Sequence, residues 1–123
     1  MQDRFRFRIW DKFCETWLTD FAINQDGEIN KFFNSEEALK RRFVLMQCTG
    51  LKDKNGKLIY EGDLVKNWDN LIYQIFWQED AACYLVESIR SKNKLGIYSL
   101  ISYQNNLEVI GNIYENPELL EVE

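Results

Sequence analysis

Histidine is missing from this 123-residue sequence, and proline occurs only once, at Pro117. Without histidine there is no Ser-His-Asp or Cys-His nucleophile, no histidine general base and no histidine metal ligand. The three cysteines, Cys14, Cys48 and Cys83, are too far apart for a Cys-x-x-Cys zinc site. We expect them to be small buried hydrophobic residues, and their odd number suits a reducing cytoplasm. No apolar run reaches the roughly 18 residues of a membrane helix, and no signal peptide is evident, so we expect no membrane association.

An excess of basic charge is missing as well. The formal net charge is -5, and residues 51–123 carry all of it, with seven Lys or Arg against twelve Asp or Glu. Because contacts to phosphate dominate affinity for nucleic acids, an acidic chain is a poor general binder of DNA or RNA. A local basic patch formed by Arg4, Arg6, Arg8 and the cluster Lys40–Arg42 keeps a nucleic-acid-binding module open as the alternative function.

Aromatic residues, by contrast, are abundant at 15% of the chain, which favours strands. The opening stretch "RFRFRIW" alternates arginine with apolar residues and predicts a strand with one wet and one packed face. The stretch "FAINQDGEINKFF" predicts a hairpin in which Asp26 and Gly27 supply the two positive-φ turn residues. The stretch "NSEEALKRRF" predicts one short helix near 35–42, with Asn34 as its cap.

Every apolar run after residue 50 is short, and turn residues separate most of the runs. This spacing is typical of a small barrel or sandwich. The predicted strands lie near 58–60, 63–67, 71–77, 82–88, 96–103 and 107–114. We therefore expect a mainly β chain that forms a single domain over 1–123, with an N-terminal hairpin lobe (about 1–48) and a C-terminal small barrel (about 49–123).

The central stretch "GLKDKNGKLIYEGDLVKN" contains two turn signals. Asn55 and Gly56 predict a protruding hairpin turn. Gly62 and Asp63 predict a tight corner that leads into the first barrel strand, because glycine permits an unusual φ and aspartate can accept backbone N–H bonds. A corner of this kind is common in SH3-like barrels. We interpret Gly62 and Asp63 as structural residues.

Four carboxylates surround this corner in the sequence: Asp53, Glu61, Asp63 and Asp69. Paired carboxylates can hold magnesium or act as acid and base. No phosphate-binding loop accompanies them, so we expect solvated turns with one structural aspartate, no catalytic residue, no metal and no cofactor. Trp68 falls in a predicted loop, where it could lie in the core or on the surface with equal ease.

The segment "LIYQIFW" is apolar on both faces when it is drawn as a strand. One face carries Leu71, Tyr73, Ile75 and Trp77, whereas the other carries Ile72 and Phe76 around Gln74. In a small barrel one face of a strand should be wet. We therefore expect Ile72 and Phe76 to be covered, either by the N-terminal lobe or by another copy of the protein, and they form the candidate self-association surface.

Three blocks of the sequence resemble the YopX family of small phage and prophage proteins. They are "FRIWDK" at 7–12, "MQCTGLKDKNGKLIYEGDLVK" at 46–66 and "EVIGNIYENPELLE" at 108–121, so the resemblance spans the chain. Cys48 departs from the pattern, which has an aromatic residue at that position. The resemblance implies a β-rich fold with an SH3-like C-terminal part and a phage or prophage origin, but it implies no activity.

The sequence therefore predicts a non-enzymatic accessory protein of the host-cell cytoplasm. We expect it to act through protein–protein contacts with an unknown host or phage partner and to form a homo-oligomer.

Overall fold

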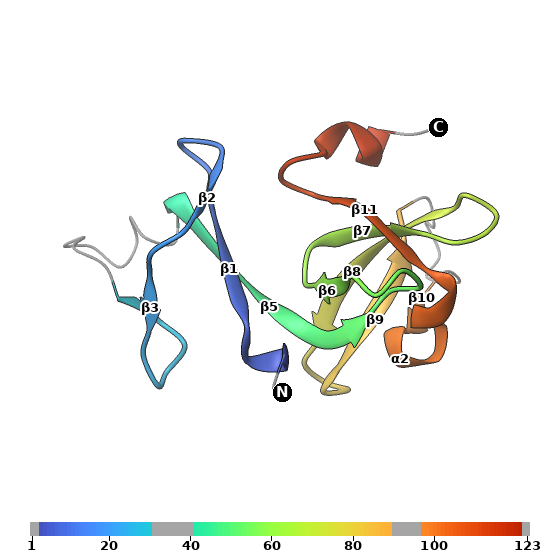
Figure 1. Cartoon of the computed structure of the whole chain (residues 1–123), viewed down its shortest axis with the longest axis horizontal. Coiled ribbons are helices and arrows are strands. Elements are labelled where there is room, and N and C mark those ends of the chain that lie inside the picture. The colour runs from blue at the N-terminus through green and yellow to red at the C-terminus, as the bar shows by residue number, and fades with distance from the viewer. Residues whose placement is uncertain (1–2, 31–40, 90–96, 122–123) are drawn as a thin grey trace. The chain divides into compact units, whose positions relative to one another are not determined.

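The computed structural model describes residues 3–30, 41–89 and 97–121. The strands are β1 (Phe7–Asp11), β2 (Thr16–Leu18), β3 (Ala22–Ile23), β4 (Ile29–Asn30), β5 (Phe43–Lys52), β6 (Leu58–Tyr60), β7 (Asp63–Lys66), β8 (Ile72–Gln78), β9 (Cys83–Ser88), β10 (Ile97–Ser99) and β11 (Glu108–Asn112). One short α-helix, α2, covers Leu100–Tyr103, and 3-10 turns cover Asp3–Phe5 (η1), Gln104–Asn106 (η2) and Pro117–Glu121 (η3). The chain is mainly β, as the sequence predicts (Figure 1).

The chain divides into two compact units. One consists of Phe7–Met46, and the other combines Met1–Arg6 with Gln47–Glu123. We call them the small unit and the large unit. Strand β5 belongs to both, because its first four residues lie in the small unit and its remainder in the large unit.

The small unit is built from two hairpins. Strands β1 and β2 pair antiparallel, with Trp10 opposite Trp17, and β1 is also hydrogen-bonded to β5. Strands β3 and β4 form a separate two-stranded hairpin. The buried side chains of this unit include Ile9 and Phe43. Trp10 and Trp17 meet edge to face at 5.0 Å between ring centroids, a geometry that aromatic pairs prefer.

The first strand of the chain is shorter than the sequence predicts. The continuous strand predicted for "RFRFRIW" is wrong in its first half, because Asp3–Phe5 form a 3-10 turn and the strand begins at Phe7. The helix predicted near 35–42 falls outside the described residues, apart from Arg41 and Arg42, which are helical.

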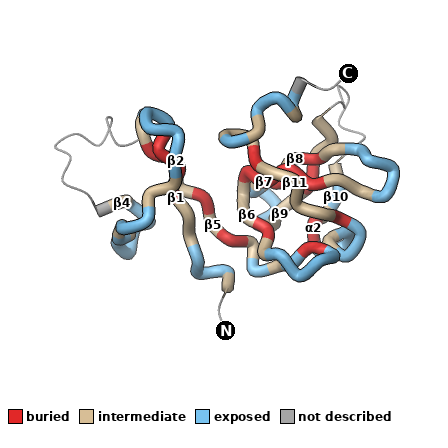
Figure 2. Tube along the Cα trace, turned by 45° about the horizontal axis from the view of Figure 1, so that its top comes forward, coloured by how far each residue is buried: buried red, intermediate tan, exposed pale blue. Residues whose placement is uncertain are grey.

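The large unit contains a five-stranded antiparallel sheet with the strand order β10-β9-β8-β7-β11. Its core includes Val65, Tyr73, Ile75 and Val86 from the sheet and Ile59 from β6. Figure 2 shows the buried residues gathering on β7 and β8. Every second residue in the first half of β8 is buried, which is the period that a strand with one face on a core requires.

The sheet of the large unit is open. Strands β10 and β11 lie at its two edges, and among the described strands they do not pair with each other. The SH3-like barrel is therefore not confirmed. The strand predicted over 96–103 is wrong in its second half, because after three strand residues the chain turns into α2. Leu100 at the start of α2 is fully buried, and its side chain is part of the core of the large unit.

Three hairpin turns share one construction, in which an Asn or Asp side chain accepts the backbone N–H groups two and four residues later. The three accepting residues are Asn24, Asp53 and Asn67. In each turn the residue three positions on, Gly27, Gly56 or Asn70, has a positive φ. This single left-handed residue fits a three-residue hairpin loop. The prediction that Asp26 also has a positive φ is therefore wrong.

Candidate functional site

The corner at Gly62 and Asp63 joins β6 to β7. Gly62 has φ +83°, its N–H donates to the carbonyl of Ile75 (3.0 Å), and its carbonyl accepts the N–H of Ile113 (3.0 Å). Asp63 is only 2% exposed, and its Oδ2 accepts the N–H of Tyr60 at 2.8 Å. The side chain thus satisfies a backbone donor immediately before the bend.

Asp53 is a second structural aspartate, in addition to Asp63, and sequence reasoning missed it. Its Oδ1 accepts the N–H groups of Asn55 and Lys57, both at 2.9 Å, and its Oδ2 accepts the N–H of Val109, also at 2.9 Å. Asp53 is 5% exposed, so it is no solvated turn residue, and the expectation of a single structural aspartate is wrong. One carboxylate therefore closes the turn and ties it to β11.

The remaining carboxylates near the corner are dispersed. Oε1 of Glu61 accepts the N–H of Gln47 at 2.9 Å, whereas Asp69 lies exposed in the turn that begins at Asn67. Within the described ranges, no group of three or more Asp, Glu or Cys side chains could hold a metal ion. The carboxylates of the central block are thus engaged in holding backbone, which is a structural use.

The candidate self-association residues Ile72 and Phe76 lie on the face of β8 opposite the core, and each is half-buried. Strand register places Leu85 beside Phe76, because these residues are paired across β8 and β9. Leu64 on β7 and Ile97 on β10 share this face. Leu64 is opposite Gln74, Gln74 is opposite Glu87 and Glu87 is opposite Ile97, and residues opposite each other in a sheet lie on the same face. We call these five apolar residues the outer face. Leu64 is fully buried, and the other four keep part of their surface exposed.

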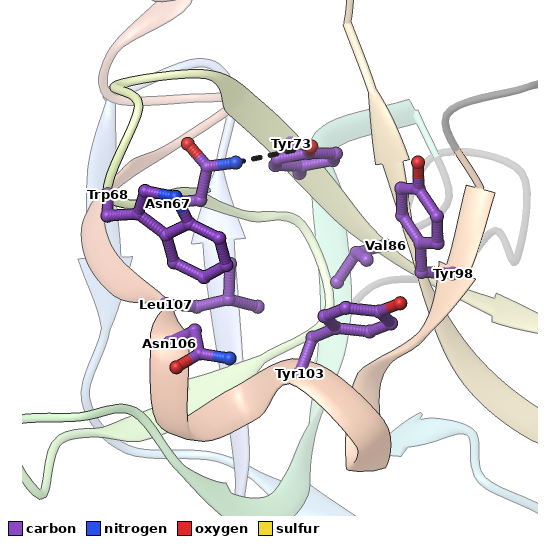
Figure 3. A pocket seen from close by; sticks show the side chains of 8 residues that line it. All are labelled: Asn67, Trp68, Tyr73, Val86, Tyr98, Tyr103, Asn106 and Leu107. Atoms are coloured by element: carbon purple, nitrogen blue, oxygen red, sulfur yellow. Dashed lines mark hydrogen bonds between the residues drawn. The ribbon is translucent and has the colours of Figure 1, made fainter.

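The described part of the large unit also contains an aromatic pocket of about 190 Å³. Its lining residues are Asn67, Trp68, Tyr73, Val86, Tyr98, Tyr103, Asn106 and Leu107. Trp68, Asn106 and Leu107 lie on one side of the space, and Tyr98 and Tyr103 lie on the other (Figure 3). Trp68 comes from the turn between β7 and β8 and is 67% exposed, so it is a surface residue.

The tyrosines of the aromatic pocket are set at steep angles to one another. The rings of Tyr98 and Tyr103 are 5.0 Å apart and inclined by 55°, and those of Tyr73 and Tyr98 are 6.2 Å apart and inclined by 68°. The amide of Asn67 donates weakly to the hydroxyl of Tyr73, at 3.5 Å (Figure 3). Burial is the main cause that raises the pKa of Tyr73, and the nearby Tyr98, Asp69 and Tyr103 raise it further. The pocket is thus a neutral aromatic space, and the carboxylate of Asp69 is in the same turn as its lining residue Trp68.

The basic residues proposed for nucleic-acid binding contact other groups of the chain. The guanidinium of Arg4 lies over the ring of Phe5, and that of Arg8 lies over the ring of Trp17. Arg6 forms an ion pair with Asp3 at 3.6 Å. Within the cluster Lys40–Arg42, Lys40 falls outside the described residues. These contacts do not favour a basic binding face.

Arg42 belongs instead to a partly buried ion pair that the sequence did not reveal. Its Nε and Nη2 donate to Oδ1 and Oδ2 of Asp11 at 3.0 and 2.8 Å. Oδ1 of Asp11 also accepts the N–H groups of Phe13 and Cys14. The bonds from Arg42, and to a smaller extent those from the backbone, outweigh the opposing effect of burial and hold the pKa of this 4%-exposed carboxyl well below its usual range. Asp11 lies in the block "FRIWDK", which was the only sequence signal for this residue. No spacing rule predicts that it pairs with Arg42, 31 residues further along the chain.

The cysteines differ from one another. Cys48 is fully buried, and burial raises the pKa of its thiol. Cys14 is exposed and Cys83 is half-buried, so the expectation of three buried thiols is wrong for these two. All three are free. No helix within the described ranges is both long and apolar enough to cross a membrane.

Fold and sites together define a small, mainly antiparallel β protein with structural carboxylates and an aromatic pocket. The model of the YopX protein family matches residues 6–121, so the chain belongs to the YopX family, and the predicted resemblance is confirmed. The crystal structure of protein EF1440 from Enterococcus faecalis is similar, with 30% sequence identity and a TM-score of 0.60, over 93% of this chain and 96% of that chain. A search of curated proteins gives no match.

Proposed function

We propose that this YopX protein is a non-enzymatic accessory protein that acts through protein–protein contacts and self-associates through the outer face. The observation that carries the proposal is that face itself: five apolar side chains lie together on the side of the sheet that faces away from the core. The expected phage or prophage origin supports an action in the cytoplasm of the host cell, on a host or phage protein.

The outer face fits a second copy of the chain better than it fits water. Ile72, Phe76, Leu85 and Ile97 come from three adjacent strands and are partly exposed, and Gln74 and Glu87 lie on the same face between them. Removing apolar surface from water contributes roughly 25 cal/mol per Å². A twofold interface presents the same patch from both copies, so one apolar patch is sufficient for a dimer.

The non-enzymatic part of the proposal rests on the residues that catalysis would need. The sequence has no histidine. Asp53 and Asp63, the buried carboxylates of the central block, both accept backbone N–H bonds, and Asp11 is held by Arg42. A carboxylate whose oxygens already accept hydrogen bonds from the protein itself is poorly placed to accept a proton from a substrate.

Sedimentation equilibrium of the whole protein tests self-association. We expect a mass above 14.7 kDa at micromolar concentrations. The variant Phe76→Glu should dissociate the oligomer, because it would place a charge next to the apolar side chain of Leu85 on the outer face. The matched control is Ile101→Glu, which makes the same kind of change at a side chain that is 70% exposed on α2, away from the outer face.

The outcomes separate clearly. A particle of 14.7 kDa that persists at high micromolar concentration contradicts self-association. Dissociation by Ile101→Glu but not by Phe76→Glu would move the interface away from the outer face. If Phe76→Glu unfolds the chain, Leu85→Glu, at the paired position on β9, takes its place as the dissociating variant. If the folded variant, Phe76→Glu or its substitute Leu85→Glu, keeps the mass of the wild-type oligomer, the outer-face interface is refuted.

A further inference from the structure

The aromatic pocket has a geometry that self-association does not explain. Trp68, Tyr73, Tyr98 and Tyr103 border one cavity of about 190 Å³, far above the 10–15 Å³ or so that a single water needs. Because their rings are steeply inclined to one another, the tyrosines do not fill the space by stacking flat together. Aromatic rings that surround a common space in this way attract cations through their electron-rich faces.

The charge near the pocket also favours a cation. None of the eight lining residues is charged, but Asp69 follows Trp68 in the same turn and is close enough to act on the hydroxyl of Tyr73. Residues 51–123 carry twelve acidic against seven basic side chains. A negative potential concentrates cations and repels phosphates, so a nucleotide is the less suitable ligand.

One polar side chain of the pocket, Asn67, is already engaged by hydrogen bonds within the protein. Oδ1 of Asn67 already accepts the N–H groups of Asp69 and Leu71, and its Nδ2 donates to Tyr73. A primary ammonium carries three donors that would lose water and need acceptors. A fully methylated ammonium has no N–H donor and needs only ring faces.

We propose that the aromatic pocket binds a quaternary ammonium group. Two sources share this chemistry: a choline-like small molecule and the side chain of a trimethylated lysine in another protein. The partly exposed Trp68 at the mouth lets either source enter from solvent. This site lies on the face of β8 that carries Tyr73, opposite the face that carries Ile72 and Phe76.

An NMR titration with choline tests the proposal, and 3,3-dimethylbutan-1-ol, the neutral isostere of choline, is the matched control. We expect millimolar choline to shift the indole N–H of Trp68 and the amides of Asn67 and Tyr103. The isostere should bind roughly three- to thirty-fold more weakly, which is the range that a cation–π contribution corresponds to. Equal binding of the two compounds would make the pocket merely apolar and would overturn the proposal, as would the absence of any shift.

Two variants sharpen the test. Trp68→Ala should weaken choline binding roughly three-fold or more. The control Trp77→Ala should not, because Trp77 is also partly exposed but pairs with Tyr84 outside the lining. Asp69→Asn should weaken the binding of choline and leave that of the isostere unchanged. If the two tryptophan variants behave alike, the assignment of this pocket is refuted.

Peptides distinguish the two sources. Tighter binding of a trimethyllysine peptide than of choline identifies a protein partner, and no gain over choline identifies a small molecule; an unmodified lysine peptide should bind weakly in both cases. Preferential binding of adenosine in the same titration would assign the pocket to nucleobase stacking and overturn the proposal. Because the site does not depend on the outer face, Phe76→Glu should leave choline binding unchanged even where it dissociates the oligomer.

Discussion

Replacing Asp53 by alanine should destabilise the protein strongly, because one side chain serves three backbone donors. The N–H groups of Asn55, Lys57 and Val109 would all lose a carboxylate acceptor at 2.9 Å. A hydrogen bond to a charged group contributes roughly 1.5–3 kcal/mol, and the two turn donors can partly recover it from water. We therefore expect Asp53→Ala to lower the free energy of unfolding by about 3–5 kcal/mol.

Asp53→Asn separates the two functions of the carboxylate. An amide oxygen can still accept the two turn N–H groups, as Asn24 and Asn67 do in the sister turns. The amide nitrogen, however, would face the N–H of Val109, which is donor against donor. We expect a loss of about 1–2 kcal/mol, together with faster hydrogen exchange at Val109 and unchanged exchange at Lys57.

Urea unfolding gives the free energies, provided that the slope with denaturant stays constant among the variants. Asn67→Ala is the matched control, because Asn67 accepts the same two turn bonds but none from a distant strand. It should destabilise the protein by about 1 kcal/mol. Equal losses for Asp53→Ala and Asn67→Ala would show that the bond to Val109 contributes nothing, and the reasoning would be refuted.

Three further predictions concern two other aspartates and one closely packed glycine. Asp63→Ala should lower the free energy of unfolding by roughly 1–3 kcal/mol and Asp63→Asn by less, and thermal melts equal to wild type for both would contradict the structural corner. Because the folded-state pKa of Asp11 is depressed, its pair with Arg42 should stabilise the fold above about pH 4 and lose that effect as pH falls further; Asp11→Asn should flatten this part of the stability–pH curve, and an unchanged curve would refute the assignment. Gly111→Ala should destabilise by roughly 1–3 kcal/mol, because its Cβ would collide with the side chain of Asn116, and an unchanged urea midpoint would argue against that packing.

Much of the fold could be predicted because local rules decide it. The strands before and after Gly62 follow from short apolar runs that turn residues separate, and β6 and β7 lie where those runs are. The failures are non-local. The segment after Ser99 is apolar enough for a strand, but Leu100 reaches the core by turning into α2, and tertiary packing outweighs β-propensity there.

The sites were harder to predict than the strands. Asp63 could be singled out because it stands beside a glycine at a bend. Asp53 could not, because its third bond is made to Val109, and no sequence rule gives that contact. The aromatic pocket combines Trp68 with Tyr98 and Tyr103, which are about thirty residues further along the chain and meet it only after β9 and α2 are in place.

The repeated turn has a consequence for how this small protein can change. In each copy the side chain at the first position accepts the hydrogen bonds and the fourth position takes the left-handed backbone, while the second position uses no side-chain atom to hold the turn. That second position is occupied by Gln25, Lys54 and Trp68, which are respectively polar, basic and aromatic. A lineage could therefore exchange the residue at the mouth of the pocket, and with it the ligand, by single substitutions that leave the hairpin and its register intact.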